Sequence, residues 1–202
     1  AYRNKQTEVV YLKQIKIACI GYILISIVFY VTGFLCILSP EVIQSCYRIL
    51  AGIILIAYGI IKITGYFSKD LYCLAFQFDF ASGILLIVLG IITLCIGSKF
   101  EGTSLLNALG VLVLIDSLLC IQTALDSKRF GLSSWKCILM LSMIAGTFAV
   151  IVILRSTITL AGCTLLAEGG MRHYIVLTTA QIPDYHYLDD NEKTKNKNEE
   201  TK

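Results

Sequence analysis

Five ionisable side chains interrupt the apolar stretches of this 202-residue sequence, and they are the residues most able to do chemistry. They are Lys62, Asp79, Asp116, Glu168 and Arg172. Carboxylates near cations at membrane depth could bind a proton or another cation, because burial and neighbouring charges both change how a carboxyl group titrates. The same residues could instead hold helices in register through ion pairs. The sequence leaves both interpretations open.

Spacing places some of these charges together. Glu168 and Arg172 are four residues apart, so they lie on one face of a helix. Asp79 enters its expected helix about 12 Å from the helix start, at 1.5 Å per residue. Together with the expected topology, these positions put all five charges in the cytoplasmic half of a helical bundle.

Small residues recur every seven positions in the same stretches. Pairs with this spacing are Gly52/Gly59, Gly110/Ser117 and Gly162/Gly169, preceded by Ser26/Gly33, Gly83/Gly90/Gly97 and Ser142/Ala149. A repeat of seven keeps small side chains on one helix face, and small residues let helices approach closely in lipid. The pattern predicts one unit of two apolar helices written three times, with these residues as helix-packing positions.

Superposing the three units aligns the charges. Tyr58, Asp116 and Glu168 then share one position, each directly before the second small residue of its pair. Lys62 and Arg172 also coincide, each ten residues after the first glycine of its pair. The alignment favours a common role for these positions, either as a proton or ion site or as contacts between helices.

Composition predicts an all-α, polytopic membrane protein. Apolar residues make up 56% of the chain and charged residues only 15%, against about 25% charged in soluble domains. Residues 17–38, 80–98 and 137–154 carry no charge, and about 20 such residues cross a membrane. We expect six transmembrane helices, at roughly 16–38, 43–67, 71–97, 103–125, 135–154 and 157–180.

The six helices are expected to form three repeated hairpins, at about 16–67, 71–125 and 135–180. The fifth and sixth helices must be separate, because residues 135–180 as one helix would be about 69 Å long. Arg155-Ser156-Thr157 is the only polar place for that turn. The first apolar segment is longer than a signal-peptide core and lacks a cleavage site, so we expect it to be a retained helix.

Lysine and arginine distribution predicts the orientation. They are dense in the N-terminal segment, the second and fourth loops and the tail, but sparse on the other side. We therefore expect a bacterial plasma-membrane protein with cytoplasmic termini: a short segment at 1–15, a transmembrane domain at 16–182 and a disordered tail at 183–202. The lipid bilayer is the expected partner and a homo-oligomer is possible; the sequence indicates no nucleic acid, and it does not reveal whether the tail binds a protein.

No motif for catalysis, a cofactor or a metal accompanies the charges. The eight cysteines are scattered and form no C-x-x-C pair, and neither histidine lies near them at ligand spacing. His173 and His186 are expected at a helix end and in the tail. We therefore expect no catalytic residue, no cofactor, no metal ion and no enzymatic activity.

Several segments resemble the HdeD-like acid-resistance membrane proteins, which are built from a short repeat of unknown function. They are residues 21–25 (GYILI), 33–35 (GFL), 48–60 (RILAGIILIAYGI) and 80–91 (FASGILLIVLGI), together with Ser39-Pro40. The resemblance covers about residues 16–180 and implies a six-helix inner-membrane protein linked to acid or envelope stress. Two functions remain open: a non-enzymatic stress-response protein, or a small proton-coupled transporter or permease using the intramembrane carboxylates.

Overall fold

The computed structural model describes residues 2–67, 79–96, 102–129, 131 and 133–179, and every regular element in these ranges is an α-helix. The helices are α1 (Tyr2–Leu38), α2 (Pro40–Phe67), α3 (Asp79–Ile96), α4 (Gly102–Arg129), α5 (Trp135–Arg155) and α6 (Ile158–Thr179). These bounds lie close to the expected ones, except that α1 extends back through the segment 1–15 to Tyr2. The first residues of the expected third helix, the tail at 183–202 and Gly97 lie outside the described residues.

Local chemistry explains where several helices end. Only Ser39 separates α1 from α2, and Pro40 opens α2, where a missing backbone N–H costs no hydrogen bond. The expected turn between the fifth and sixth helices is confirmed at Ser156. Its backbone is left-handed, with φ of 47° and ψ of 44°, and its N–H caps α5 by donating to the carbonyl of Val152.

The helices identify a multi-pass membrane protein. Four of them contain stretches long and apolar enough to cross a membrane: Cys19–Leu38, Cys46–Phe67, Gly102–Arg129 and Trp135–Arg155. Asp79–Cys95 of α3 is apolar but shorter. Large apolar side chains face outward along these helices, including Leu38 and Leu154 at 75% exposure each. Such surfaces suit contact with hydrocarbon rather than water.

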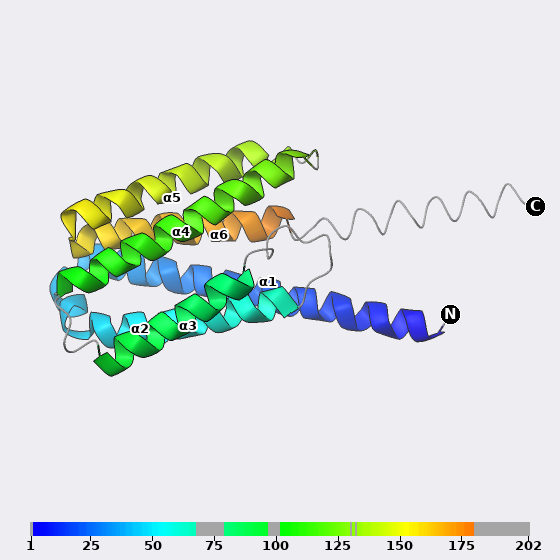
Figure 1. Cartoon of the computed structure of the whole chain (residues 1–202), viewed down its shortest axis with the longest axis horizontal. Coiled ribbons are helices and arrows are strands. Elements are labelled where there is room, and N and C mark those ends of the chain that lie inside the picture. The colour runs from blue at the N-terminus through cyan, green and yellow to red at the C-terminus, as the bar shows by residue number, and fades with distance from the viewer. Residues whose placement is uncertain (1, 68–78, 97–101, 130, 132, 180–202) are drawn as a thin grey trace, which may run out of the picture.

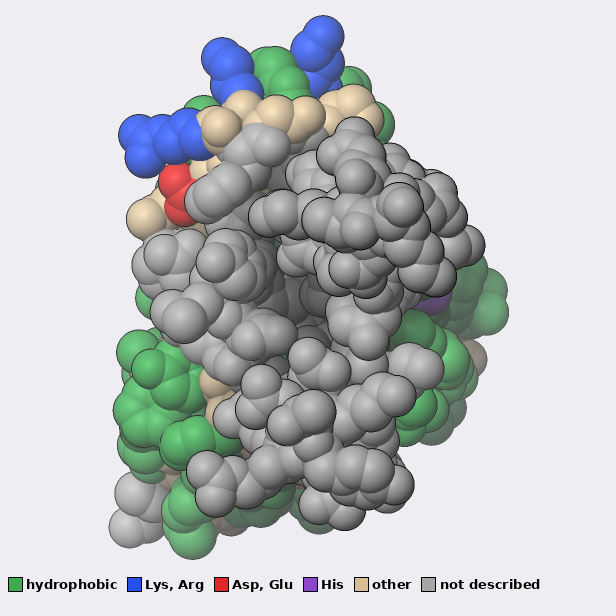
Figure 2. All heavy atoms as spheres, turned by 90° about the vertical axis from the view of Figure 1, so that its right-hand side faces the viewer, with side chains coloured by type: hydrophobic (Ala, Val, Ile, Leu, Met, Phe, Trp, Pro, Cys, Tyr) green, Lys and Arg blue, Asp and Glu red, His purple; other side chains and the backbone are tan. Residues whose placement is uncertain are grey.

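The helices run alternately in opposite directions along one bundle axis, as Figure 1 shows. The N-terminal part of α1 projects beyond the bundle, at the end where α6 also finishes. That end carries Lys128 and Arg129 in the last turn of α4, and blue Lys and Arg side chains gather there in Figure 2. Lys128 and Lys136 lie over the ring of Trp135, with Nζ 4.8 and 5.8 Å from its centroid.

Three helix pairs make the most extensive contacts: α2 with α3, α4 with α5, and α1 with α6. Each pair joins the second helix of one expected unit to the first helix of another, and the third pair closes the arrangement into a ring. Helices within one expected hairpin pack less closely, and α3 and α4 pack little against each other. The tightest contacts therefore lie between the expected units rather than inside them.

Small residues form the contact line of each of these three pairs. A Cβ built on Gly59 would lie 2.7 Å from the carbonyl oxygen of Gly83, and one on Gly162 would lie 2.7 Å from that of Gly33. Between α4 and α5, a Cβ on Gly110 would lie 3.0 Å from the carbonyl oxygen of Ala149. We call these contact lines the three seams. Because the residues on these lines are small, the two helix backbones come into close contact, and a larger side chain would have no room there.

Candidate functional site

The structure brings all five charged residues of the sequence analysis to one place inside the bundle. Lys62 comes from α2, Asp79 from α3, Asp116 from α4, and Glu168 and Arg172 from α6. None of them is more than 7% exposed. We call these five residues the charge network. Charges at such depth are costly and are expected to be paired with one another.

Lys62 joins α2 to two other helices. Its Nζ donates to Asp79 Oδ1 at 3.0 Å and to Asp116 Oδ1 at 2.8 Å. The same ammonium lies 5.1 Å from the ring centroid of Tyr58, within range of a cation–π attraction. The long apolar stem of Lys62 spans the interior of the bundle, so the side chain does not reach toward the headgroups.

Asp116 receives more contacts than any other member of the charge network. Its Oδ2 accepts a hydrogen bond from the Tyr58 hydroxyl at 2.9 Å and another from Arg172 Nε at 2.9 Å, and it also contacts Arg172 Nη2. With Lys62 on Oδ1, both carboxylate oxygens have cationic partners. One side chain thus ties α4 to α2 and α6.

Glu168 differs from Asp116, because only one of its carboxylate oxygens has a cationic partner. Its Oε1 contacts Arg172 Nε at 3.3 Å, the i,i+4 pair expected from the spacing. Its Oε2 accepts no hydrogen bond from a described donor, although the residue is only 2% exposed, and the Asp116 carboxylate lies within hydrogen-bonding reach of the Glu168 carboxyl group. A buried acceptor without a donor is unfavourable, so this oxygen is a place where the charge network can take up a proton or a hydrogen-bond donor.

Tyr22 was not identified from the sequence. It lies in α1, is 1% exposed, and its hydroxyl donates to Asp79 Oδ2. A signal was present in the spacing: Tyr22 precedes Ser26 by four residues, as Asp79 precedes Gly83 and Ile138 precedes Ser142. All three side chains are buried, so the register of the small residues marks this interior position. An aromatic residue in an apolar run otherwise resembles ordinary core.

The aligned positions of the three units meet in the interior. Tyr58, Asp116 and Glu168 lie on α2, α4 and α6, and all are buried. Cys120 occupies on α4 the position that Lys62 and Arg172 occupy on their helices, and it is 2% exposed. The interior is therefore built from corresponding positions filled with different side chains, which here gives two carboxylates and two cations, and Asp79 of α3 adds the third carboxylate.

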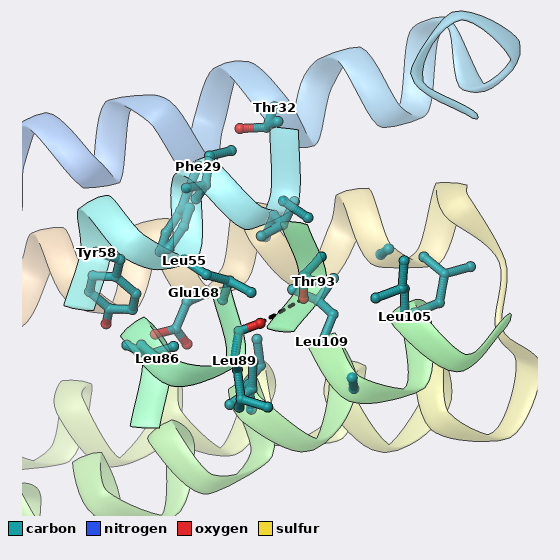
Figure 3. Close-up of a pocket in the computed structure, with 18 of the residues that line it drawn as sticks. Phe29, Thr32, Leu55, Tyr58, Leu86, Leu89, Thr93, Leu105, Leu109 and Glu168 are labelled. Carbon is teal, nitrogen blue, oxygen red and sulfur yellow. Dashed lines mark hydrogen bonds between the residues drawn. The ribbon is translucent and has the colours of Figure 1, made fainter. Parts of the chain in front are cut away.

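A cavity of about 150 Å³ lies beside the charge network. Residues from α1, α2, α3, α4 and α6 line it, and nearly all are apolar. In Figure 3 the carboxyl group of Glu168 lies near Tyr58 and Leu86, whereas Leu105 lies toward the opposite end. Asp116 and Glu168 both belong to the lining, so the cavity reaches the network at one end.

The remaining candidates lie elsewhere. Gly52, Gly59, Gly83, Gly90, Gly110, Ser117, Gly162 and Gly169 all lie at the seams or beside them. His173 is in α6, with its ring centroid 6.5 Å from that of Tyr30, while His186 lies outside the described residues. Within the described ranges no group of three His, Cys, Asp or Glu side chains could hold a metal ion.

Comparison with known proteins gives one family match. Residues 24–95, which contain the C-terminal part of α1, all of α2 and nearly all of α3, match the family described as a short repeat of unknown function (DUF308). No curated protein matches the chain, and no solved structure does. The matched family includes HdeD-like proteins, and its repeat occurs where the sequence shows the first seven-spaced small residues.

Proposed function

We propose that the chain is a six-span plasma-membrane protein without enzymatic activity, in which the charge network holds three repeated helical hairpins in register. The observation that carries this proposal is the pairing of Lys62 and Asp116, which joins α2 to α4 where these helices have no seam between them. Arg172 extends the connection to α6. A paired, buried network of this kind acts as polar contact between helices in lipid.

The network supports an accessory role rather than a catalytic one. Its acids and bases are occupied by one another, with the exception of Glu168 Oε2. The likeness of residues 24–95 to the short repeat, and the resemblance to HdeD-like proteins, support a role in acid or envelope stress in a bacterial inner membrane. Survival of cells lacking the protein, measured after acid exposure, tests this role.

The surrounding partners belong to the same proposal. The outward apolar faces of the helices suit the lipid bilayer as partner. The basic residues near the exposed end of α4 support cytoplasmic N- and C-termini, following the positive-inside rule. A bundle of three hairpins is narrow, so a pathway for a substrate would need a second copy of the chain.

One observation favours a second function, a small proton-coupled transporter or permease. Glu168 Oε2 is buried without a partner and belongs to a residue that lines the cavity. A carboxyl group in that position can hold a proton and release it, as relay residues in membrane transporters do. The charge around Glu168 would then be adjusted by the other four members of the charge network, Asp116, Asp79, Lys62 and Arg172.

One experiment separates the two functions. We expect Asp116→Asn/Glu168→Gln to lower the midpoint of thermal unfolding in detergent micelles, because Arg172 loses both of its carboxylate partners and Lys62 keeps only Asp79. Proteoliposomes holding the wild-type protein are then expected to keep an imposed pH gradient. Dissipation by the wild type that disappears in a folded double mutant would overturn the accessory role and establish a proton pathway.

A further inference from the structure

The cavity has the dimensions of a small-molecule site. Its volume of about 150 Å³ matches a buried apolar cavity that holds benzene in another protein. Along α4 it reaches from Leu105 to Asp116, a rise of about 16 Å at 1.5 Å per residue. Leucine side chains make up much of the wall, including Leu55, Leu86 and Leu109. An occupant must therefore be mostly apolar and narrow.

Hydroxyl groups in the wall offer little to a polar ligand. Thr93 donates to the carbonyl of Leu89 at 2.8 Å, the bond drawn in Figure 3, and Thr32 donates to that of Val28. These bonds keep the hydroxyl protons within the helices. Apart from the Tyr47 hydroxyl, which lies beside Gly102 at the start of α4, the polar recognition groups are therefore concentrated at the Glu168 end of the cavity.

Charge counting decides what that end can accept. The network contains three carboxylates and two cations, so one negative charge is in excess when all five are ionised. Both oxygens of Asp79 and of Asp116 have donors, which leaves the excess at Glu168, whose Oε2 is unpartnered. With Glu168 ionised, a monovalent cation balances this charge and an anion would double it, whereas a neutral ligand leaves Glu168 dependent on a proton.

The same end contains aromatic surfaces. Phe29 and Tyr58 both line the cavity and meet edge to face, with ring centroids 5.2 Å apart. Aromatic faces attract ammonium groups, and the attraction is stronger where water is excluded. A carboxylate oxygen without a donor and two aromatic rings together form a typical environment for an amine.

Access is available from the side of the bundle. Leu85 of α3 and Ile115 of α4 line the cavity, and each is 39% exposed on the outer surface. They lie on the two neighbouring helices that pack little against each other. A molecule dissolved in the hydrocarbon of the bilayer can therefore enter between α3 and α4 without crossing a polar layer.

We propose that this cavity binds a small apolar amine as its ammonium ion, with an ammonium N–H donating to Glu168 Oε2. The apolar body lies against Leu86, Leu89 and Leu109, and the ammonium replaces the proton that otherwise neutralises Glu168. The groups facing Glu168 and its partners are Asp116, Arg172, Lys62 and Tyr58, with Asp79 and Tyr22 beyond Lys62. The site extends the transporter candidate by naming its substrate class, but binding itself requires no transport.

The test measures binding of benzylamine to the purified full chain in nanodiscs by calorimetry, with benzyl alcohol and benzoate as probes of the same size. We expect benzylamine to bind saturably and to release a proton, which is detected by repeating the titration in buffers of different ionisation enthalpy. We expect benzyl alcohol and benzoate to bind at least about tenfold more weakly, the difference that a charged hydrogen bond makes. Benzyl alcohol binding as tightly as benzylamine would overturn the proposal.

Two variants and a matched control locate the site. Glu168→Gln is expected to abolish benzylamine binding, and Leu109→Phe to abolish it by filling the cavity while leaving the network intact. Glu41→Gln makes the same chemical change at an exposed residue and is expected to bind as the wild type does. If Glu168→Gln does not fold, Leu109→Phe decides: undiminished binding there overturns the proposal. If vesicles holding the protein keep their pH gradient, proton transport is excluded, but the results of the binding measurements still stand.

Discussion

At the scale of single residues, the network shows why buried charges are tolerated here. Lys62 is fully buried, and its charge is compensated because two carboxylate oxygens lie within 3.0 Å of its Nζ. Removing one partner from such a pair leaves an uncompensated charge, which costs more than the pair contributed. The stability of the bundle therefore depends on keeping the charges balanced.

We expect Lys62→Met to destabilise the folded protein by about 3–5 kcal/mol, the usual result when one partner of a buried ion pair is removed. Asp79 would keep only the Tyr22 hydroxyl as a donor among the contacts described above, whereas Asp116 would still contact Arg172 and Tyr58. Adding Asp79→Asn to Lys62→Met should therefore restore part of the loss. Unfolding in mixed detergent micelles measures both variants.

Lys136→Met serves as the control, because Lys136 is exposed and lies at the bundle end beside Trp135. It should unfold nearly as the wild type does. Equal stability of Lys62→Met and the wild type would contradict the residue-scale argument and would mean that water or lipid compensates the two aspartates.

At the scale of helices, the seams explain why small residues are needed at these positions. A Cβ on Gly59 would meet the Gly83 carbonyl oxygen at 2.7 Å and the Ile87 backbone nitrogen at 3.0 Å. Backbone atoms cannot move aside as a flexible side chain can. Pairs α2–α3, α4–α5 and α1–α6 share this construction, so the same kind of close approach is used three times.

We expect Gly59→Ala to lower the midpoint of thermal unfolding, because α2 and α3 must separate to admit the methyl group. Gly146→Ala is the matched control within the same bundle. A Cβ there would lie 3.5 Å from Ser117 Cβ, an ordinary contact, and alanine favours helix by about 1 kcal/mol over glycine. A Gly59→Ala protein as stable as Gly146→Ala would show that the α2–α3 seam is not tightly constrained.

The sequence was informative about the helices and less so about their partners. Long apolar runs and the polar triplet at Ser156 predicted where helices lie and where α5 ends, because these depend on local chemistry. The period of seven located the packing faces, but a face does not specify which helix it meets. Partner choice depends on the whole arrangement, and for that reason the ring of seams could be found only in the structure.

At the scale of the whole molecule, one end of the bundle differs from the other. The described part of α1 begins at that end, α6 finishes there, and Lys and Arg side chains gather there in Figure 2. Arg155 lies in the last turn of α5, at the other end. Anionic lipids on the cytoplasmic face attract basic residues and so favour one orientation of the bundle.

Labelling at single cysteines tests that orientation. Ser133 and Thr157 are both exposed and lie beside opposite ends of α5. In a background with Cys46, Cys73, Cys95 and Cys137 changed to serine, we expect an impermeant maleimide to label Thr157→Cys in intact cells. Ser133→Cys should react only after the membrane is permeabilised, because the positive-inside rule places the turn before α5 in the cytoplasm.

The reverse pattern would invert the bundle and place the basic end of α4 outside the cell. Labelling of both cysteines in intact cells would mean that the turn before α5 and the turn before α6 lie on the same side. In that case α5 could not cross the membrane, and the six-span arrangement would be wrong.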